Sequence, residues 1–177
     1  MKPSPRIEPE FSRPLTADSI GSQTQRREIV AEASERKALA NRFGLVSLDG
    51  LSASLELRRQ GDVIRLAGHL VGDVVQSCVV SLAPVPAHIE TDFEASYGPG
   101  ASEPELDIDP IAGDAPEPLV GGRIDLGETV AQQLAVVLDP YPRAPGAALP
   151  SGDFGAPGEE TGAKQPFAAL AALKKRP

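Results

Sequence analysis

The sequence is poor in the residue types that most often carry chemistry. It contains one cysteine, Cys78, and two histidines, His69 and His88, among 177 residues. A single cysteine excludes an intrachain disulfide bond and any zinc site built from cysteines alone. With only two histidines, even a mixed zinc site would need carboxylate ligands as well. We therefore expect no metal and no cofactor, and the scarcity of cysteine favours a reducing, cytoplasmic environment.

Long apolar runs and aromatic side chains are also scarce. No segment approaches the roughly 18 uninterrupted apolar residues that a transmembrane helix requires, and the N-terminus has no apolar stretch typical of a signal peptide. The chain has five phenylalanines, two tyrosines and no tryptophan, which leaves few rings for stacking on RNA bases. We expect no membrane contact and no direct recognition of RNA bases.

Acidic groups, in contrast, are abundant and concentrated in one region. The formal net charge is −8. Residues 100–139 carry nine acidic side chains and one basic side chain, whereas the rest of the chain carries equal numbers of each. Such a block repels phosphate backbones and attracts positively charged proteins. The charge pattern therefore predicts a basic protein partner.

Local patterning near the N-terminus predicts a short edge strand followed by a helix. Apolar and polar residues alternate over residues 10–17, EFSRPLTA, where Pro14 is compatible only with an edge strand. Ser22 begins a weak capping box, and residues 26–43 are rich in helix formers. Gly44 is placed to end this helix. We expect one helix over residues 26–43.

Residues 45–97 show a period of two, which predicts three long antiparallel strands with one wet face. The polar sequence at 59–62, RQGD, predicts a turn between the first two strands. His69 and His88 fall on the polar face. The apolar face is predicted to contain Leu51, Ala53, Leu55, Leu57, Ile64, Leu66, Leu70, Val74, Cys78, Val80, Leu82, Ile89, Phe93 and Tyr97.

A second helix is predicted after the acidic region. Asp125 is a helix N-cap with Glu128 at the third helical position, and apolar residues at helical spacing follow. Pro140 ends this helix. Residues 98–122, rich in proline, glycine and acidic groups, are predicted to be a mobile acidic loop. We expect a proline- and glycine-rich linker at 143–166 and a short helical segment at 167–177.

These elements predict a single α+β domain over residues 1–142. Its sheet would be curved and mainly antiparallel, could close into a barrel, and would carry two packed helices, with flexible termini. For Cys78, a nucleophile would need a nearby base and an exposed, electropositive setting, whereas its strand parity places it in the core. The histidines are best explained as solvated or locally hydrogen-bonded side chains. With no recognisable nucleophile–base pair or metal cluster, we predict that the protein is not an enzyme.

Candidate binding residues lie in the acidic region and around the second helix. The alternating carboxylates at 103–109 lack the glycine and glutamate positions of a calcium-binding EF-hand, so they form either a solvated arm or a surface that attracts a cationic partner. Tyr141 and Arg143 lie on a proline-stiffened turn, which either only ends the helix or forms a recognition surface. The residues predicted to bind a partner are Glu105, Asp107, Asp109, Asp125, Glu128, Asp139, Tyr141 and Arg143.

The order of several motifs resembles the YceD-like family, the large ribosomal RNA subunit accumulation proteins, in the style of its alphaproteobacterial members. The motifs are NRFGLVSLDGLSASLELRR, then GHLVGDVVQSCVVSLAPVPAHIETDFEASYGP, an acidic stretch, IDLGETVAQQLAVVLDPYPRAPGA and PFAALAALK. Family members commonly carry Cys-x-x-Cys where this chain reads CVVS. Because Ser81 stands in the second position here, the case for a metal at this place is removed.

The resemblance implies a cytoplasmic, non-enzymatic ribosome-biogenesis factor that supports accumulation or processing of 23S ribosomal RNA. Family genes commonly neighbour one for a basic large-subunit ribosomal protein, so we expect such a protein, or an assembly particle, as partner, with indirect contact to RNA. No small-molecule substrate is expected. The alternative is a direct RNA-binding module that uses the basic C-terminal residues Lys174, Lys175 and Arg176. A third, less favoured hypothesis is that the protein is a hydrolase.

Overall fold

A computed structural model describes residues 9–99 and 116–148 of the chain, and the structural statements below concern these residues. The chain divides into two units, Met1–Ala147 and Ala148–Pro177, and the fold is that of the first. Its elements in chain order are β1 (Pro14–Thr16), the 3-10 helix η1 (Ala17–Ser19), β2 (Gln25–Val30), α1 (Ala33–Phe43), β3 (Ser47–Gln60), β4 (Val63–Ser77), β5 (Pro84–Gly98), β6 (Glu117–Pro118), β7 (Arg123–Asp125) and α2 (Leu126–Val137).

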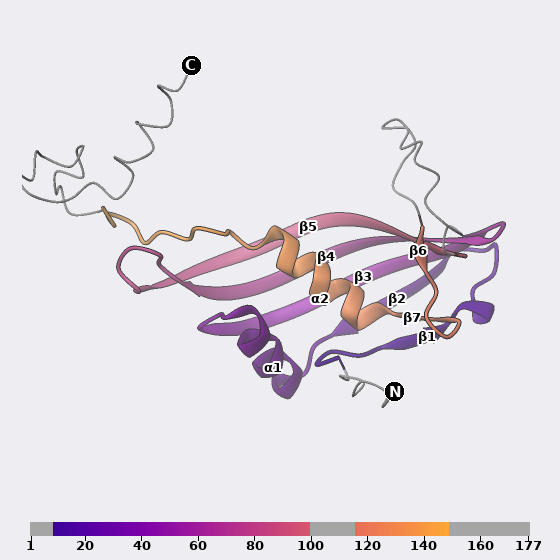
Figure 1. Ribbon diagram of the computed structural model, residues 1–177, viewed down its shortest axis with the longest axis horizontal. Helices are drawn as coiled ribbons and strands as arrows, with labels where there is room; N and C mark the ends of the chain where they lie inside the picture. The colour runs from indigo at the N-terminus through magenta and orange to yellow at the C-terminus, as the bar shows by residue number, and fades with distance from the viewer. Residues whose placement is uncertain (1–8, 100–115, 149–177) are drawn as a thin grey trace, which may run out of the picture. The chain divides into compact units, whose positions relative to one another are not determined.

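A meander of three long antiparallel strands, β3, β4 and β5, forms the centre of a five-stranded sheet (Figure 1). The strand order is β2-β3-β4-β5-β6, and only β5 and β6 are parallel. Both helices contribute to the core against this sheet, so the predicted α+β class is confirmed. The described strands leave the sheet open between β2 and β6, and the predicted option of a closed barrel is not realised. No described helix has the length and apolar character that crossing a bilayer requires.

A tight turn sets the register of β3 and β4. Gln60 pairs with Val63 across the two-residue loop formed by Gly61 and Asp62. Gly61 has a φ of 60°, the left-handed conformation that two-residue hairpin loops require. The turn therefore lies within the predicted range 59–62. Because side chains alternate between faces, this register decides which residues of both strands point into the core.

The inward face of the meander is apolar, as the period of two predicts. Four even-numbered residues of β4 are each at most 2% exposed: Ile64, Leu66, Leu70 and Val74. Glycine occupies Gly68 and Gly72 on the same face. Leu134 of α2 lies 3.6 Å from the position that a Cβ of Gly72 would take, so α2 packs closely on the sheet at this glycine.

The opposite face is polar and carries both histidines. His69 Nδ1 lies 2.7 Å from Asp92 Oδ1, and His88 Nδ1 lies 2.7 Å from Asp73 Oδ1. Each aspartate raises the pKa of its histidine, because the carboxylate stabilises the protonated imidazole. The histidines are thus locally hydrogen-bonded groups on the wet face, as the sequence predicts.

The predicted first helix is wrong over its first part. We expected a helix over residues 26–43, but residues 25–30 form β2 and pair antiparallel with β3. Helix α1 begins only after Glu32, which forms a capping box with the first turn. Pairing with β3 overrides helix propensity here, because it satisfies the backbone and buries Ile29 to 8% exposure. The end of the helix at Gly44, with φ of 66°, is confirmed.

The end of β4 also differs from prediction. Cys78 is fully buried as expected. However, β4 ends at Ser77, so the inward face does not continue to Val80 and Leu82. Leu82 has a φ of 61° and is 78% exposed. The alternation fails because a turn, and not a continued strand, follows the cysteine.

Part of the region predicted to be a mobile loop belongs to the sheet. Residues 100–115 lie outside the described residues, and so do residue 149 onward, with most of the predicted linker and the predicted helix at 167–177. Beyond the gap, β6 pairs in parallel with the end of β5, and the N–H of Leu119 donates to the carbonyl of Gly98 at 3.3 Å. The loop prediction is therefore wrong for β6.

Helix α2 agrees well with its prediction. The side chain of Asp125 accepts hydrogen bonds from the N–H groups of Gly127 and Glu128, which confirms the predicted N-cap. The helix ends at Val137, three residues before Pro140. Its inward face buries Leu126, Val130 and Leu134. One position of the apolar pattern, Val137, departs from it, since its side chain is 38% exposed.

The segment that leads into β1 crosses the first turn of α2 at Gly127. A Cβ at Gly127 would lie 2.4 Å from the carbonyl oxygen of Phe11 and 3.2 Å from the main-chain nitrogen of Arg13. The N–H of Leu126 donates to the carbonyl of Arg13 at 3.1 Å. Only glycine lets the two main chains approach this closely, because the obstructing atoms are backbone and cannot rotate away.

We predict that Gly127→Ala destabilises the protein by about 1–3 kcal/mol, as overpacked cores do. The sign of this change in the free energy of unfolding shows whether the site is obstructed, because alanine in an unobstructed helix is about 1 kcal/mol more favourable than glycine. Urea unfolding measures the change. The matched control is Gly21→Ala, where nothing lies within 4 Å of the new Cβ, and its effect should stay within about 0.5 kcal/mol. A stabilised Gly127→Ala would contradict the close crossing.

Candidate interaction surface

The structure places five of the eight residues predicted to bind a partner. Glu105, Asp107 and Asp109 lie outside the described residues. Asp125 and Glu128 lie at the start of α2. The others lie beyond its end: Asp139, Tyr141 and Arg143. The two groups occur in different surroundings.

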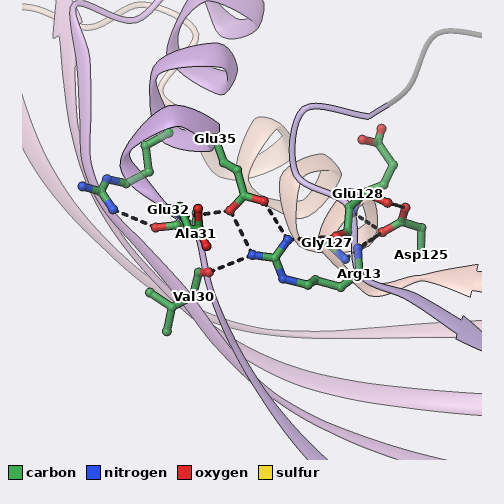
Figure 2. A network of polar contacts seen from close by, with 10 residues as sticks. Arg13, Val30, Ala31, Glu32, Glu35, Asp125, Gly127 and Glu128 are labelled. Atoms are coloured by element: carbon green, nitrogen blue, oxygen red, sulfur yellow. Dashed lines mark hydrogen bonds and ion pairs between the residues drawn. The ribbon is translucent and has the colours of Figure 1, made fainter.

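Asp125 fastens the start of α2 to the N-terminal segment (Figure 2). Besides capping the helix, its carboxylate accepts a hydrogen bond of 2.5 Å from the hydroxyl of Ser12 and one of 2.7 Å from the N–H of Arg13. A negative charge at this position also interacts favourably with the helix dipole. Four donors therefore converge on one carboxylate, which gives Asp125 a structural role.

Glu128 joins α2 to α1. The guanidinium of Arg42 donates to both oxygens of Glu128, at 2.9 and 2.8 Å, and also contacts Glu10 at 3.0 Å. Paired hydrogen bonds of this kind fix geometry as well as charge. The side chain of Glu128 is only 21% exposed. Much of its capacity to accept hydrogen bonds is thus used inside the protein.

Another arginine, Arg13, connects the N-terminal segment to α1, as Figure 2 shows. Arg13 donates to both carboxylate oxygens of Glu35 in α1, at 2.6 and 2.9 Å, and to the carbonyl of Val30 at 3.2 Å. The hydrogen bond from Arg13 is the main cause that lowers the pKa of Glu35. We call this set of contacts the clasp, formed by Arg13, Glu35, Arg42, Asp125 and Glu128. The structure shows that Asp125 and Glu128 make contacts within the protein. A partner-binding role for these two residues stays a prediction.

The other predicted residues lie on what we call the hairpin-tip surface, formed by the β4–β5 loop at 78–83 and the turn at 139–144. The N–H of Val79 donates to the carbonyl of Pro142 at 2.9 Å. Figure 1 shows the segment after α2 running beside the loop between β4 and β5. Two segments about 60 residues apart in sequence thus form one surface.

The turn after α2 holds its two predicted anchor residues outward. Pro142 is buried, whereas its neighbours Tyr141 and Arg143 are exposed, Tyr141 to 72%. The N–H of Tyr141 donates to Asp139 Oδ1 at 2.9 Å, and Gln76 Nε2 donates to the carbonyl of Asp139 at 2.9 Å. Main-chain and side-chain bonds therefore fix this turn, which lowers the entropy cost of binding through Tyr141.

Apolar side chains next to the turn were missed by the sequence analysis. Val79 is 48% exposed and Leu82 is 78% exposed. Val136, on the last turn of α2, is 76% exposed. The strand parity had placed Leu82 in the core. The local indications of a turn were Ser81, a residue type common in turns, and Pro84.

Cys78 lies beneath this surface and organises the loop. Its sulfur accepts hydrogen bonds from the N–H groups of Val80 and Ser81, both at 3.4 Å. Its own N–H donates to the carbonyl of Ala83 at 2.8 Å, and its carbonyl accepts from the N–H of Leu82 at 2.9 Å. The loop is therefore closed around the cysteine by both main-chain and side-chain bonds.

These donors lower the pKa of the Cys78 thiol to about 6. The largest cause is the backbone N–H of Ala144, followed by Ser81 and Val80, while burial acts in the opposite direction. Because the sulfur is completely buried, it lacks the exposure of reactive cysteines. In the described part of the chain no three or more cysteine, histidine or acidic residues are grouped so that they could hold a metal ion. The cysteine instead links the hairpin loop to the turn at 139–144.

Comparison with known proteins gives one match. The model of a family described as "Large ribosomal RNA subunit accumulation protein YceD" matches residues 66–174. The matched range contains most of β4, all of β5 and α2, and both segments of the hairpin-tip surface. No curated protein and no solved structure gives a match.

We predict that Asp125→Ala lowers the free energy of unfolding by about 1–2 kcal/mol, because the N-cap bonds are lost. Glu28→Ala is the control, since it removes an exposed carboxylate on β2 and should change stability by no more than about 0.5 kcal/mol. Chemical denaturation of the three proteins measures both effects. Equal stability of Asp125→Ala and the wild type would contradict the clasp.

We predict that Cys78 titrates near pH 6 in the folded protein, compared with about 8.5 for an ordinary thiol. The folded state then binds this proton less tightly than the unfolded chain. Stability relative to Cys78→Ala should therefore rise between about pH 6 and 8.5 and be lost as the pH falls through about 6. Ultraviolet absorbance of the thiolate measures the titration, with Cys78→Ala as baseline. An ordinary thiol pKa would show that the N–H groups do not stabilise the thiolate.

Proposed function

Because this chain belongs to the YceD family, we propose that it is a non-enzymatic ribosome-biogenesis factor that supports accumulation or processing of 23S ribosomal RNA. The observation that carries the proposal is the family match over residues 66–174. The description of that family implies involvement in the accumulation of large-subunit ribosomal RNA. We place this activity in the cytoplasm.

The proposed mechanism is binding to a basic large-subunit ribosomal protein or to an assembly particle that contains one. The net charge of −8 supports a positively charged partner. The hairpin-tip surface supports protein binding, because Tyr141 and Arg143 project from a fixed turn beside exposed Val79 and Leu82. Tyrosine and arginine surrounded by apolar side chains are typical anchors of protein interfaces.

The charge arrangement of the wet sheet face favours a protein partner over direct contact with RNA. Arg58 and Arg65 are directly opposite each other on β3 and β4. The adjacent row carries Arg26, Glu56, Ala67 and Glu94, so two carboxylates lie among the three arginines. This arrangement weakens attraction to a phosphate backbone. The basic C-terminal residues of the RNA-binding alternative lie outside the described residues.

We predict that cells depleted of the protein accumulate fewer large subunits and more precursor of their RNA. The wild-type chain should restore normal particles, whereas the double variant Tyr141→Ala, Arg143→Ala should restore few of them. Sucrose-gradient profiles and analysis of precursor RNA measure this result. The control is Arg26→Ala, Val30→Ala, which removes an exposed arginine and an exposed apolar side chain on β2 and should restore particles fully.

Binding measurements on the purified protein test the proposed mechanism separately from the proposed function. Loss of one interface anchor typically costs about 2 kcal/mol or more, or at least about 30-fold in Kd. The double variant should therefore bind basic large-subunit ribosomal proteins at least this much more weakly. Normal large subunits after depletion would contradict the function. Tight binding to ribosomal RNA fragments, without binding to any ribosomal protein, would contradict the mechanism.

A further inference from the structure

Strand β5 forms an open edge of the sheet along most of its length. Its fifteen residues all lie next to β4 except the last, but on its other side β6 pairs only with Tyr97 and Gly98. Within the described residues, positions 84–96 therefore have a strand on one side only (Figure 1). An unpaired edge of this length presents a row of main-chain donors and acceptors that another strand can join.

The structure indicates which residues present these groups. The carbonyl of Gly98 accepts a hydrogen bond from Leu119, on the side away from β4. Main-chain N–H and C=O groups alternate in direction along an antiparallel strand. The main-chain groups of the other even-numbered residues of β5 therefore also point away from β4. Pro84 and Pro86 have this parity, and they lack an N–H. The edge that can donate and accept hydrogen bonds therefore runs from His88 to Ser96.

The side chains along this edge are acidic on one face of the sheet and apolar on the other. On the wet face stand Glu90, Asp92 and Glu94, which are all exposed. On the inward face, Ile89 and Phe93 pack against the core but remain partly exposed, because no strand covers them from the edge side. A strand added here would meet carboxylates on one face and apolar side chains on the other.

A hollow next to the carboxylates leaves room for long side chains. It has a volume of about 440 Å³ and is lined by small residues, among them Ala67 and Gly68, and by His69, Asp92 and Glu94. Glu94 lies directly opposite Ala67 on β4. Lysine or arginine side chains from an added strand can therefore extend over the wet face near these acidic groups.

We propose that the edge of β5 from His88 to Ser96 binds an extended segment of a basic protein as an additional strand. The segment carries lysine or arginine at alternate positions, facing Glu90, Asp92 and Glu94, and apolar residues between them, facing Ile89 and Phe93. Main-chain hydrogen bonds supply affinity, and the alternating side chains supply specificity. The inference rests on the proposed function only for the basic character of the partner.

Charge also disfavours the simplest competing occupant, a second copy of β5. In the register centred on Asp92, two antiparallel copies would place the carboxylates of Glu90, Asp92 and Glu94 opposite one another. Like charges directly across a strand pair are destabilising. The same side chains that repel a second copy attract a basic strand.

Hydrogen exchange of the full chain, followed by NMR at single amides, tests the edge directly. In the free protein the amides of Glu90, Asp92 and Glu94 should exchange fast, and those of Thr91 and Phe93 slowly. The probe is a synthetic octapeptide of alternating lysine and valine. At about ten times its Kd it should slow exchange of the three outward amides about tenfold. The control peptide, with glutamate in place of lysine, should leave them unchanged.

A pair of substitutions at one position separates main-chain pairing from charge. Glu94→Pro removes the outward N–H at a parity that the strand already accepts at Pro84 and Pro86, whereas Glu94→Gln removes only the charge. The proline variant should bind the lysine–valine peptide at least about tenfold more weakly than the glutamine variant. Circular dichroism and slow exchange at Thr91 verify that both variants are folded.

Three outcomes would overturn the inference. The first is slow exchange of the outward amides in the free protein, which would mean that the edge is already covered. The second is equal binding by the proline and glutamine variants. The third is dimerisation through β5, seen as concentration-dependent protection of the same amides without peptide. If depletion shows normal large subunits while the peptide still protects the edge, the proposed function fails and this inference stands.

Discussion

The structure depends on covering one face of a long antiparallel meander. Strands β3, β4 and β5 each run for fourteen or fifteen residues, well beyond the common strand length of about five or six. A single sheet of this size exposes a large apolar face unless other elements bury it. Both helices and the N-terminal segment contribute buried residues to the core, among them Phe11, Leu39 and Leu134. Within the described residues, no other strand or helix covers the opposite face, and most of the β5 edge has no strand beside it.

The clasp explains how segments distant in sequence stay on that face. Arg13 and Arg42 each form an ion pair with a carboxylate on another element of the fold. Asp125 accepts hydrogen bonds from both the N-terminal segment and α2. Partly buried pairs of this type fix orientation more than they add stability, because desolvation offsets much of the attraction. The crossing at Gly127 shows why orientation matters, since two main chains meet there with no space for a side chain.

The parts of the fold that were predictable are those decided by neighbours in sequence. The turn at Gly61 and the cap at Asp125 need only local residue types, and both lie where the sequence placed them. Residues 25–30 are good helix formers, and only their pairing with β3 makes them a strand. At the candidate site, the flanking prolines made Tyr141 a predicted contact residue, and the structure shows that it is exposed. Leu82 was placed in the core instead, because strand parity cannot show where a strand ends. The clasp joins residues up to 112 positions apart, which no local pattern reveals.

The acidic row on β5 connects the protection of an edge with the choice of a partner. Proteins commonly guard an exposed edge with charge or proline, because an unguarded edge promotes aggregation. This chain uses both, with prolines at the start of β5 and carboxylates along its middle. Lysine would protect equally well against self-association but would repel a basic strand. The use of carboxylates as the protecting charge therefore disfavours pairing with a second copy and favours pairing with the positively charged segment that we propose.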